Sequence, residues 1–229
     1  ARTDVPAGHY AEVLGLLGLM LLHHSRRAAR VGAAGELILL SEQDRGLWDR
    51  RAIQEGLALV EKAFHMRQIG PYQLQAAISA LHARAASADA TDWPQIAGLY
   101  AELRRHGDSP IIQLNHAAAC SMAYGPQAGL ALLAPLAESL RDFAPFHLAR
   151  ADMLRRSGQA ADAIAAYTSA LALTHNAVER DFIAARKSPR SSNSLPSLLL
   201  ATRRRASSAV PRPKISPKTT NPAFIFHPF

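Results

Sequence analysis

Histidines are the residues of this chain that most invite a search for metal binding or catalysis, because it has ten of them. His23 and His24 are adjacent, and neighbouring side chains on a helix point about 100° apart, so the two cannot easily face one ion. Others, such as His82 and His116, stand singly, and no H-E-x-x-H pattern occurs. The sequence therefore predicts surface or hydrogen-bonded structural roles for the histidines and no metal site.

Motifs for nucleophilic or phosphate chemistry are also missing, since the sequence has no G-x-S-x-G, G-x-x-x-x-G-K-[ST] or G-x-G-x-x-G pattern. The single cysteine, Cys120, lies in an apolar run and is predicted to be a small core residue. The carboxylates that could form an acid–base pair are interpreted instead as helix caps and surface charges: Asp44, Asp49, Asp152 and Asp162. We therefore expect no enzymatic activity, no cofactor and no small-molecule substrate.

The formal net charge of +8 is unevenly distributed along the chain. Residues 1–185 carry 17 Lys and Arg against 18 Asp and Glu, whereas residues 186–229 carry 9 basic residues and no acidic ones. The body of the chain is thus nearly neutral, which argues against a DNA-binding face on it. Three arginines at 203–205 could touch nucleic acid or an anionic surface, or could equally belong to a solvated tail.

The cysteine content and the length of the apolar runs indicate the cellular compartment of the protein. One cysteine cannot form an intrachain disulfide, which fits a reducing compartment. The longest strongly apolar run, residues 13–22, is half as long as the ~20 residues that a membrane-spanning helix needs. We therefore expect a cytoplasmic protein that makes no membrane contact.

The elements that must position these side chains are predicted to be helices. Hydrophobic residues make up 48% of the chain, and Ala and Leu, both strong helix formers, dominate them. Helices are predicted over about 10–30 and, after a capping box at 41–44, over 43–66. Residues 37–40 remain either an extended connector or one helical turn. Later helices begin at Gly70-Pro71, Trp93-Pro94 and Ser109-Pro110, giving eight or nine helices up to residue 185.

Residues 144–177 fit the 34-residue tetratricopeptide pattern of two packed helices. The pattern consists of small residues where the two helices must approach closely, a glycine that ends the first helix and a tyrosine that fills the gap to the next repeat. These residues are Ala151, Gly158, Ala163, Tyr167 and Ala170. Two degenerate copies lie around Trp93 and Gly125. The alternative is a generic helical bundle in which the Ala and Tyr spacing is fortuitous.

The predicted fold is all-α, with antiparallel helix pairs in a tetratricopeptide-like right-handed superhelix. We divide it into an N-terminal helical part (1–69), the helical repeats (70–185) and a disordered basic tail rich in Ser and Pro (186–229). Stacked repeats present a concave surface to a protein partner. The candidate partner-binding residues are Gln73, Gln75, Ser79, His82 and Asn115. Asn115 could clamp a bound backbone or satisfy a neighbouring helix end, and Trp48 is predicted to pack in the core.

Several short segments occur in the order found in a known family. They are Glu12-Val13-Leu14-Gly15-Leu16, Leu19-Met20-Leu21-Leu22 with Arg26-Arg27, Gln43-Asp44-Arg45 with Trp48-Asp49, Gly70-Pro71-Tyr72-Gln73-Leu74-Gln75-Ala76-Ala77-Ile78, Asp92-Trp93, Ser109-Pro110, Gly125-Pro126, Ala149-Arg150-Ala151-Asp152 through Gly158, and 176–182. Together they resemble the C-terminal extension, with tetratricopeptide-like repeats, of extracytoplasmic-function RNA polymerase sigma factors. The resemblance covers about 12–185.

The resemblance implies a role in transcription initiation by contact with sigma regions, polymerase or a regulator. No helix-turn-helix candidate is found, and there is no room before Glu12 for the regions that bind polymerase core and promoter, so the chain is expected to be the extension alone. After Phe182 the family pattern gives way to the Ser/Pro/Arg tail, which a shifted reading frame or an appended segment would explain. The alternatives are a free-standing adaptor that binds a peptide in its groove and a truncated remnant without function.

Overall fold

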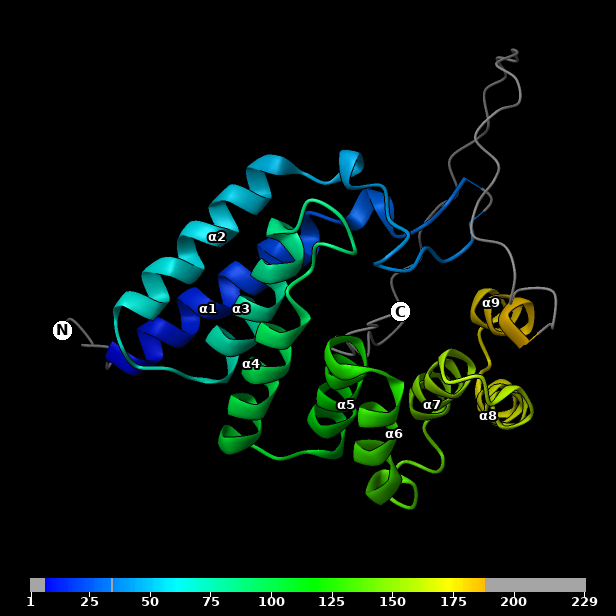
Figure 1. Cartoon of the computed structure of the whole chain (residues 1–229). Coiled ribbons are helices and arrows are strands. Elements are labelled where there is room, and N and C mark those ends of the chain that lie inside the picture. Colours follow the sequence, from blue (N-terminus) through cyan, green and yellow to red (C-terminus); the bar gives the residue numbers. More distant parts are fainter. Residues whose placement is uncertain (1–6, 34, 188–229) are drawn as a thin grey trace, which may run out of the picture.

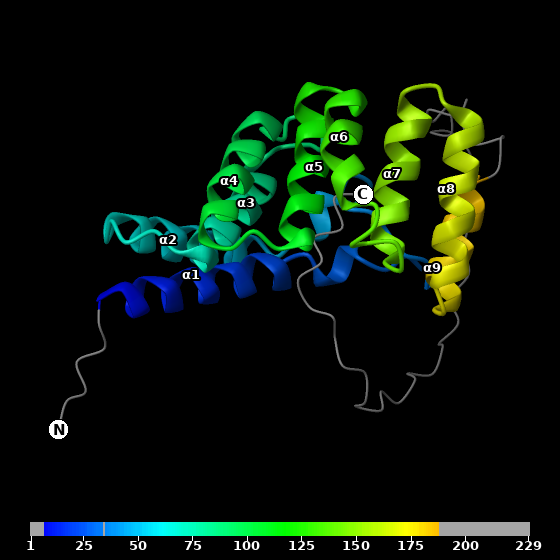
Figure 2. The ribbon, with the colours of Figure 1, turned by 90° about the horizontal axis from the view of Figure 1, so that it is seen from below.

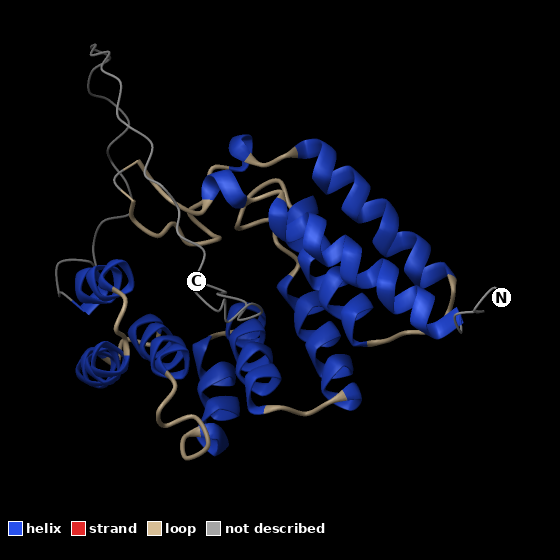
Figure 3. Ribbon diagram, turned by 180° about the vertical axis from the view of Figure 1, so that it is seen from behind, coloured by secondary structure: helices blue, strands red, loops and turns tan. Residues whose placement is uncertain are grey.

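The computed structural model describes residues 7–33 and 35–187, and within them the regular structure is helical. Nine α-helices and three short 3-10 helices occur in these ranges, with one isolated β-bridge (Figures 1 and 3). The α-helices are α1 (Ala7–His24), α2 (Arg50–His65), α3 (Pro71–Arg84), α4 (Trp93–His106), α5 (Pro110–Tyr124), α6 (Pro126–Leu133), α7 (Ala144–Arg156), α8 (Ala160–Leu173) and α9 (Ala177–Lys187). The predicted all-α class is confirmed.

Helix starts follow the capping residues that the sequence indicated from α3 onward. The Asp92 side chain accepts a hydrogen bond from the Gln95 amide at 3.0 Å, and Ser109 accepts one from the Ile112 amide at 3.2 Å. Each satisfies an amide in the first turn that has no partner within the helix. Gly70 precedes Pro71 at the start of α3, as predicted.

The N-terminal part differs from its prediction in two places. The first helix ends at His24 and is followed by a 3-10 helix, Arg27–Ala29, instead of continuing to residue 30. The box at 41–44 does not start α2: Asp44 caps the 3-10 helix Arg45–Leu47, and Asp49 caps α2. The chain is extended at Trp48, between these two helices, and this places the indole in the N-terminal core, where it is buried as predicted.

The segment between the first two α-helices is an extended connector, which settles the alternative left open for residues 37–40. Val31 and Leu37 form an antiparallel bridge, and the Ile38 amide donates to the Arg30 carbonyl at 2.9 Å. We call residues 35–44 the connector. It reaches from the α1 end of the molecule toward α9 (Figure 1).

Consecutive helices pack as antiparallel pairs, with α1 and α2 lying across the ends of the upright pairs (Figure 2). The α7–α8 pair is the tetratricopeptide unit expected from the sequence, and Gly158 between its helices adopts φ +78°. Its core is built from the predicted small residues and tyrosine: Ala151, Ala163, Tyr167 and Ala170. Core residues of α1 and α3 share one cluster, so packing is continuous across the predicted boundary at 69/70. The tail predicted for 186–229 lies outside the described residues except for Arg186 and Lys187, which end α9 instead.

Two helix pairs touch through their backbones at glycines. A Cβ added at Gly56 of α2 would lie 3.2 Å from the Gly18 carbonyl oxygen of α1 and 2.9 Å from Cγ of Leu22. A Cβ at Gly129 of α6 would lie 2.5 Å from Cβ of Ser121. These distances leave no room for a methyl group, so the pairs depend on glycine at both contacts.

Replacing Gly56 with alanine should therefore lower the free energy of unfolding by about 1–3 kcal/mol, because the helices must move apart. The matched control is Gly98→Ala in α4, where an added Cβ meets nothing within 4 Å. That change should raise stability by about 0.5–1 kcal/mol, since alanine loses less backbone entropy in a helix. Urea denaturation monitored by circular dichroism measures both, and equal effects of the two changes would contradict the close-contact argument.

Candidate functional site

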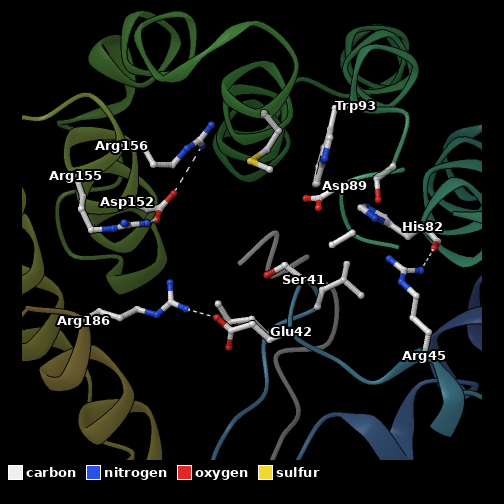
Figure 4. Close-up of a pocket in the computed structure, with 15 residues that line it drawn as sticks. Ser41, Glu42, Arg45, His82, Asp89, Trp93, Asp152, Arg155, Arg156 and Arg186 are labelled. Carbon is white, nitrogen blue, oxygen red and sulfur yellow. Dashed lines mark hydrogen bonds and ion pairs between the residues drawn. The ribbon is translucent and has the colours of Figure 1, made fainter. Parts of the chain in front are cut away.

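A cavity of about 630 Å³ lies between the helices and the connector, which contributes Ser41 and Glu42 to its wall (Figure 4). A cavity of this size falls in the range of ligand and peptide pockets. It is lined by four arginines, three carboxylates, a histidine and a tryptophan among apolar neighbours. The polar lining residues are Ser41, Glu42, Arg45, His82, Asp89, Thr91, Asp152, Arg155, Arg156 and Arg186.

One wall of the cavity is a carboxylate held between two arginines of α7. The Arg155 guanidinium donates to the Asp152 carboxylate at 2.7 Å, and a nitrogen of Arg156 lies 3.7 Å from the same carboxylate. Arg156 also donates to the hydroxyl and the backbone oxygen of Ser121 in α5, at 2.9 and 3.0 Å. Asp152 was expected to be a surface charge, which is wrong: its side chain is only 9% exposed, because α7 turns this position toward α5 and the cavity.

The opposite wall is organised by Arg45, which follows the connector. Its guanidinium donates to the carbonyls of His82 and Ala85 at 2.7 and 3.0 Å, and so satisfies carbonyls at the end of α3. The same group lies 4.4 Å from the centre of the Trp48 ring, within the range of a cation–π interaction. Arg45 therefore fixes the end of the connector to the end of α3.

His82 is the titratable group most altered by this site. It is buried, and its ring meets the Trp93 ring edge-on at a centroid distance of 5.2 Å. Burial, assisted by the positive charges of Arg26 and Arg45 and by His23, lowers the pKa of His82 to about 3. The imidazole is therefore neutral at physiological pH and contributes no charge to the cavity.

An ion pair between distant parts of the chain completes the ring around the cavity. Arg186 of α9 donates to the Glu42 carboxylate of the connector at 2.8 Å, across 144 positions of sequence (Figure 4). The Arg186 guanidinium also lies 4.6 Å from the centre of the Phe182 ring. The arginines of the cavity are thus engaged with carboxylates or with backbone and side-chain oxygens.

A second, smaller cavity of about 80 Å³ lies beside the first and is mostly apolar. The connector contributes Leu37 and Leu39 to its wall. The remaining wall comes from α5, α7, α8 and α9 and the loop before α9, and includes Asn115, Leu148, Tyr167, Thr174, Phe182 and Ile183. Asn115, one of the candidates from sequence, lines this smaller cavity, and we call the wall that α5, α7, α8 and α9 contribute the groove of the repeats.

The other candidate residues do not form one surface. His82 lines the large cavity, but Gln73 is fully buried at the joint of α1 and α3, where its amide nitrogens donate to Glu12 at 3.2 and 3.3 Å. Ser79 is buried, and Gln75 is half-buried with its side chain donating to the Pro71 carbonyl at 3.3 Å. Assigning Gln73 and Ser79 to the groove is therefore wrong, because both are buried in the packing of α3, and Gln75 lines neither of the two cavities.

The charged residues of the cavity were missed by sequence reasoning. Asp152 with Arg155 and Arg156, at spacings i+3 and i+4 on a repeat helix, is a signal that could have indicated an internal ion-pair cluster. Nothing local connects Glu42 with Arg186.

Among the helices that the structure describes, none is long and apolar enough to cross a membrane. In the same residues, no group of three His, Cys, Asp or Glu side chains is placed to hold a metal ion.

Comparisons with known proteins connect this chain to uncharacterized relatives. Residues 3–64, which contain α1, the connector and nearly all of α2, match a family of unknown function, DUF6596. Over 172 residues the chain is 46% identical to an uncharacterized protein of Rhizobium meliloti strain 1021, a stretch that makes up 75% of this chain and 41% of that protein. The chain thus spans less than half the length of this relative. No solved structure matches it.

The lowered pKa of His82 predicts a loss of stability in acid. The folded pKa of about 3 lies below the usual 6.5, so the unfolded chain takes up a proton that the folded chain refuses as pH falls from about 6.5 toward 3. In His82→Gln this pH dependence should weaken by at most about 1.4 kcal/mol per pH unit. The measurement is urea denaturation from pH 7 to 4. The control is the exposed His175→Asn, in which the free energy of unfolding should depend on pH as it does in wild type. An unchanged pH dependence in His82→Gln would contradict the lowered pKa of His82.

The carboxylate of Asp152 should be needed for the fold of the cavity wall. Asp152→Asn removes the charge facing Arg155 and Arg156 and should lower the free energy of unfolding by about 1–3 kcal/mol. The control, Asp181→Asn, changes an exposed carboxylate of α9 and should have an effect within about 0.5 kcal/mol. Thermal unfolding of the three proteins tests this, and indistinguishable stabilities would show that the ion-pair cluster contributes nothing.

Proposed function

We propose that this chain is the C-terminal protein-interaction part of an extracytoplasmic-function sigma factor and acts in transcription initiation, in the cytoplasm, by contact rather than catalysis. Binding of polymerase core and promoter DNA is assigned to regions outside this chain. The ordered motifs over 12–185 support the proposal. The Rhizobium relative, of which the matched stretch is 41%, is long enough to hold such regions.

The observation that carries the proposal is a row of exposed apolar side chains on α1. Tyr10, Val13, Leu17 and Met20 are 44%, 57%, 44% and 57% exposed, and their spacing of three, four and three residues places them on one side of the helix. We call these four residues the α1 stripe. Single exposed apolar residues are ordinary, but a contiguous row marks a surface that binds another protein.

The opposite side of α1 is already buried in the N-terminal core, through residues such as Leu19 and Leu22. A helix that is apolar on all sides is normally covered on all sides. A polar group borders the stripe, since the Lys62 ammonium lies 5.8 Å from the centre of the Tyr10 ring. An apolar centre with a polar rim is the usual composition of a protein interface.

A helical region of the sigma factor, with an apolar face of its own, is the partner that fits the α1 stripe. The rival function is a free-standing adaptor that binds an extended peptide in the groove of the repeats, which the charged cavity favours. A truncated remnant without function is the remaining alternative, and it predicts that no partner is retained.

The test is binding of the full chain to purified bacterial RNA polymerase and to the part of the Rhizobium relative outside the matched stretch. We expect a complex with at least one of them, seen by size-exclusion chromatography. Val13→Glu with Met20→Glu should weaken it about tenfold or more, because charges replace the apolar centre of the interface.

The matched control for this experiment is Tyr124→Ser, which removes an exposed aromatic side chain at the end of α5 and should leave the affinity unchanged. If the chain forms a complex with neither RNA polymerase nor the remaining part of the Rhizobium relative, the sigma-factor proposal is refuted. Binding that is insensitive to the two α1 changes would refute the role of the α1 stripe.

A further inference from the structure

The connector lies against the C-terminal repeats, along the wall of the small apolar cavity. Leu37 and Leu39 alternate along an extended backbone and share the wall of the small apolar cavity with residues of α5, α7 and α9. Leu148 and Phe182 are among the residues on the groove side. An extended segment that places alternate side chains in an apolar groove is a recurring mode of peptide binding.

The connector makes different contacts with the N-terminal core and with the C-terminal repeats. Leu40, next to Leu39, packs into the N-terminal core with Trp48 and is buried. On the other side, Glu42 forms its ion pair with Arg186 of α9 at 2.8 Å. Residues 37–42 therefore place two apolar side chains in the groove and one carboxylate against Arg186. The packing of Leu40 in the N-terminal core keeps the segment close to the groove.

The attachment to the repeats is the weaker of the two. The Glu42 and Arg186 side chains are 55% and 25% exposed, and an ion pair of this kind changes the ratio of attached to released segments by about fivefold at most. The apolar side chains leave a cavity of about 80 Å³ beside them, so the groove is incompletely filled. The backbone hydrogen bonds of residues 37 and 38 are local, as from the Ile38 amide to the Arg30 carbonyl at 2.9 Å, so the turn 30–38 can leave the groove together with the connector and keep them.

We propose that residues 37–42 are an internal ligand that blocks the groove of the repeats. A protein partner displaces them with an extended segment of the same chemistry: two leucine-like side chains two positions apart and a carboxylate three positions further on. Release of the connector also opens the large cavity, because Leu39 and Glu42 line it. This goes beyond the proposed function, since it holds for a sigma region, a regulator or an unrelated protein as the partner.

Displacement is tested with a fluorescent peptide of residues 36–44 added to the full chain. In wild type, residues 37–42 compete with the peptide for the groove at high effective concentration. The apparent affinity for the peptide is therefore the intrinsic affinity multiplied by the fraction of molecules whose groove is open. The variant Leu37→Ser with Leu39→Ser has lost its internal ligand and should bind the peptide about tenfold or more tightly than wild type does. A peptide carrying the same two serines should not bind. Equal affinities, or no binding by the folded variant, would overturn the proposal.

A milder variant keeps the test decisive if the double variant does not fold. Glu42→Gln removes only the charge of the ion pair with Arg186, and amide hydrogen exchange should become faster in the connector while that of α2 stays the same. The matched control is Glu138→Gln, whose ion pair with Arg141 at 3.1 Å is exposed and involves no connector residue. Unchanged connector exchange in Glu42→Gln, or equal acceleration in the control, would overturn the proposal independently of any sigma-factor binding.

Discussion

Close contact between helix backbones is the constraint on which the rest of this structure depends. At Gly18 and Gly56, and again at Gly129, neighbouring helices approach too closely for any added side chain. Alanines perform the same role in the α7–α8 pair. Helices in such contact have little freedom to slide or tilt against each other, so the arrangement within each pair is fixed.

Charges within the cavity are compatible with burial because they are paired or neutralised. Asp152 lies between two arginines, Arg45 satisfies the carbonyls of a helix end, and His82 is kept neutral by its surroundings. An unpaired buried charge would cost several kcal/mol, so this pattern is a condition of folding as much as a feature of a site. It also means that a ligand must exchange existing contacts for new ones, which favours a segment that brings both carboxylate and apolar groups.

The molecule presents two surfaces of different character. The α1 stripe is outward-facing, apolar and open, whereas the groove of the repeats is inward-facing and covered by the connector. Both involve the segment that matches the family of unknown function, since residues 3–64 include α1 and the connector. The proposed contact at the stripe and the proposed release of the connector can therefore be tested separately, because different side chains carry them.

The sequence by itself determined the helical class, the starts of α3, α4 and α5 and the α7–α8 pair, because these depend on neighbours within a few residues. Asp92, Ser109 and Gly158 act locally, and their roles could be predicted. Only the tertiary structure decided that Asp152 is buried, that Gln73 lies at the joint of α1 and α3, and that the connector crosses to α9. Those outcomes depend on contacts such as that between Glu42 and Arg186, 144 positions apart. No local pattern encodes such a contact, since it exists only after the helix pairs have stacked.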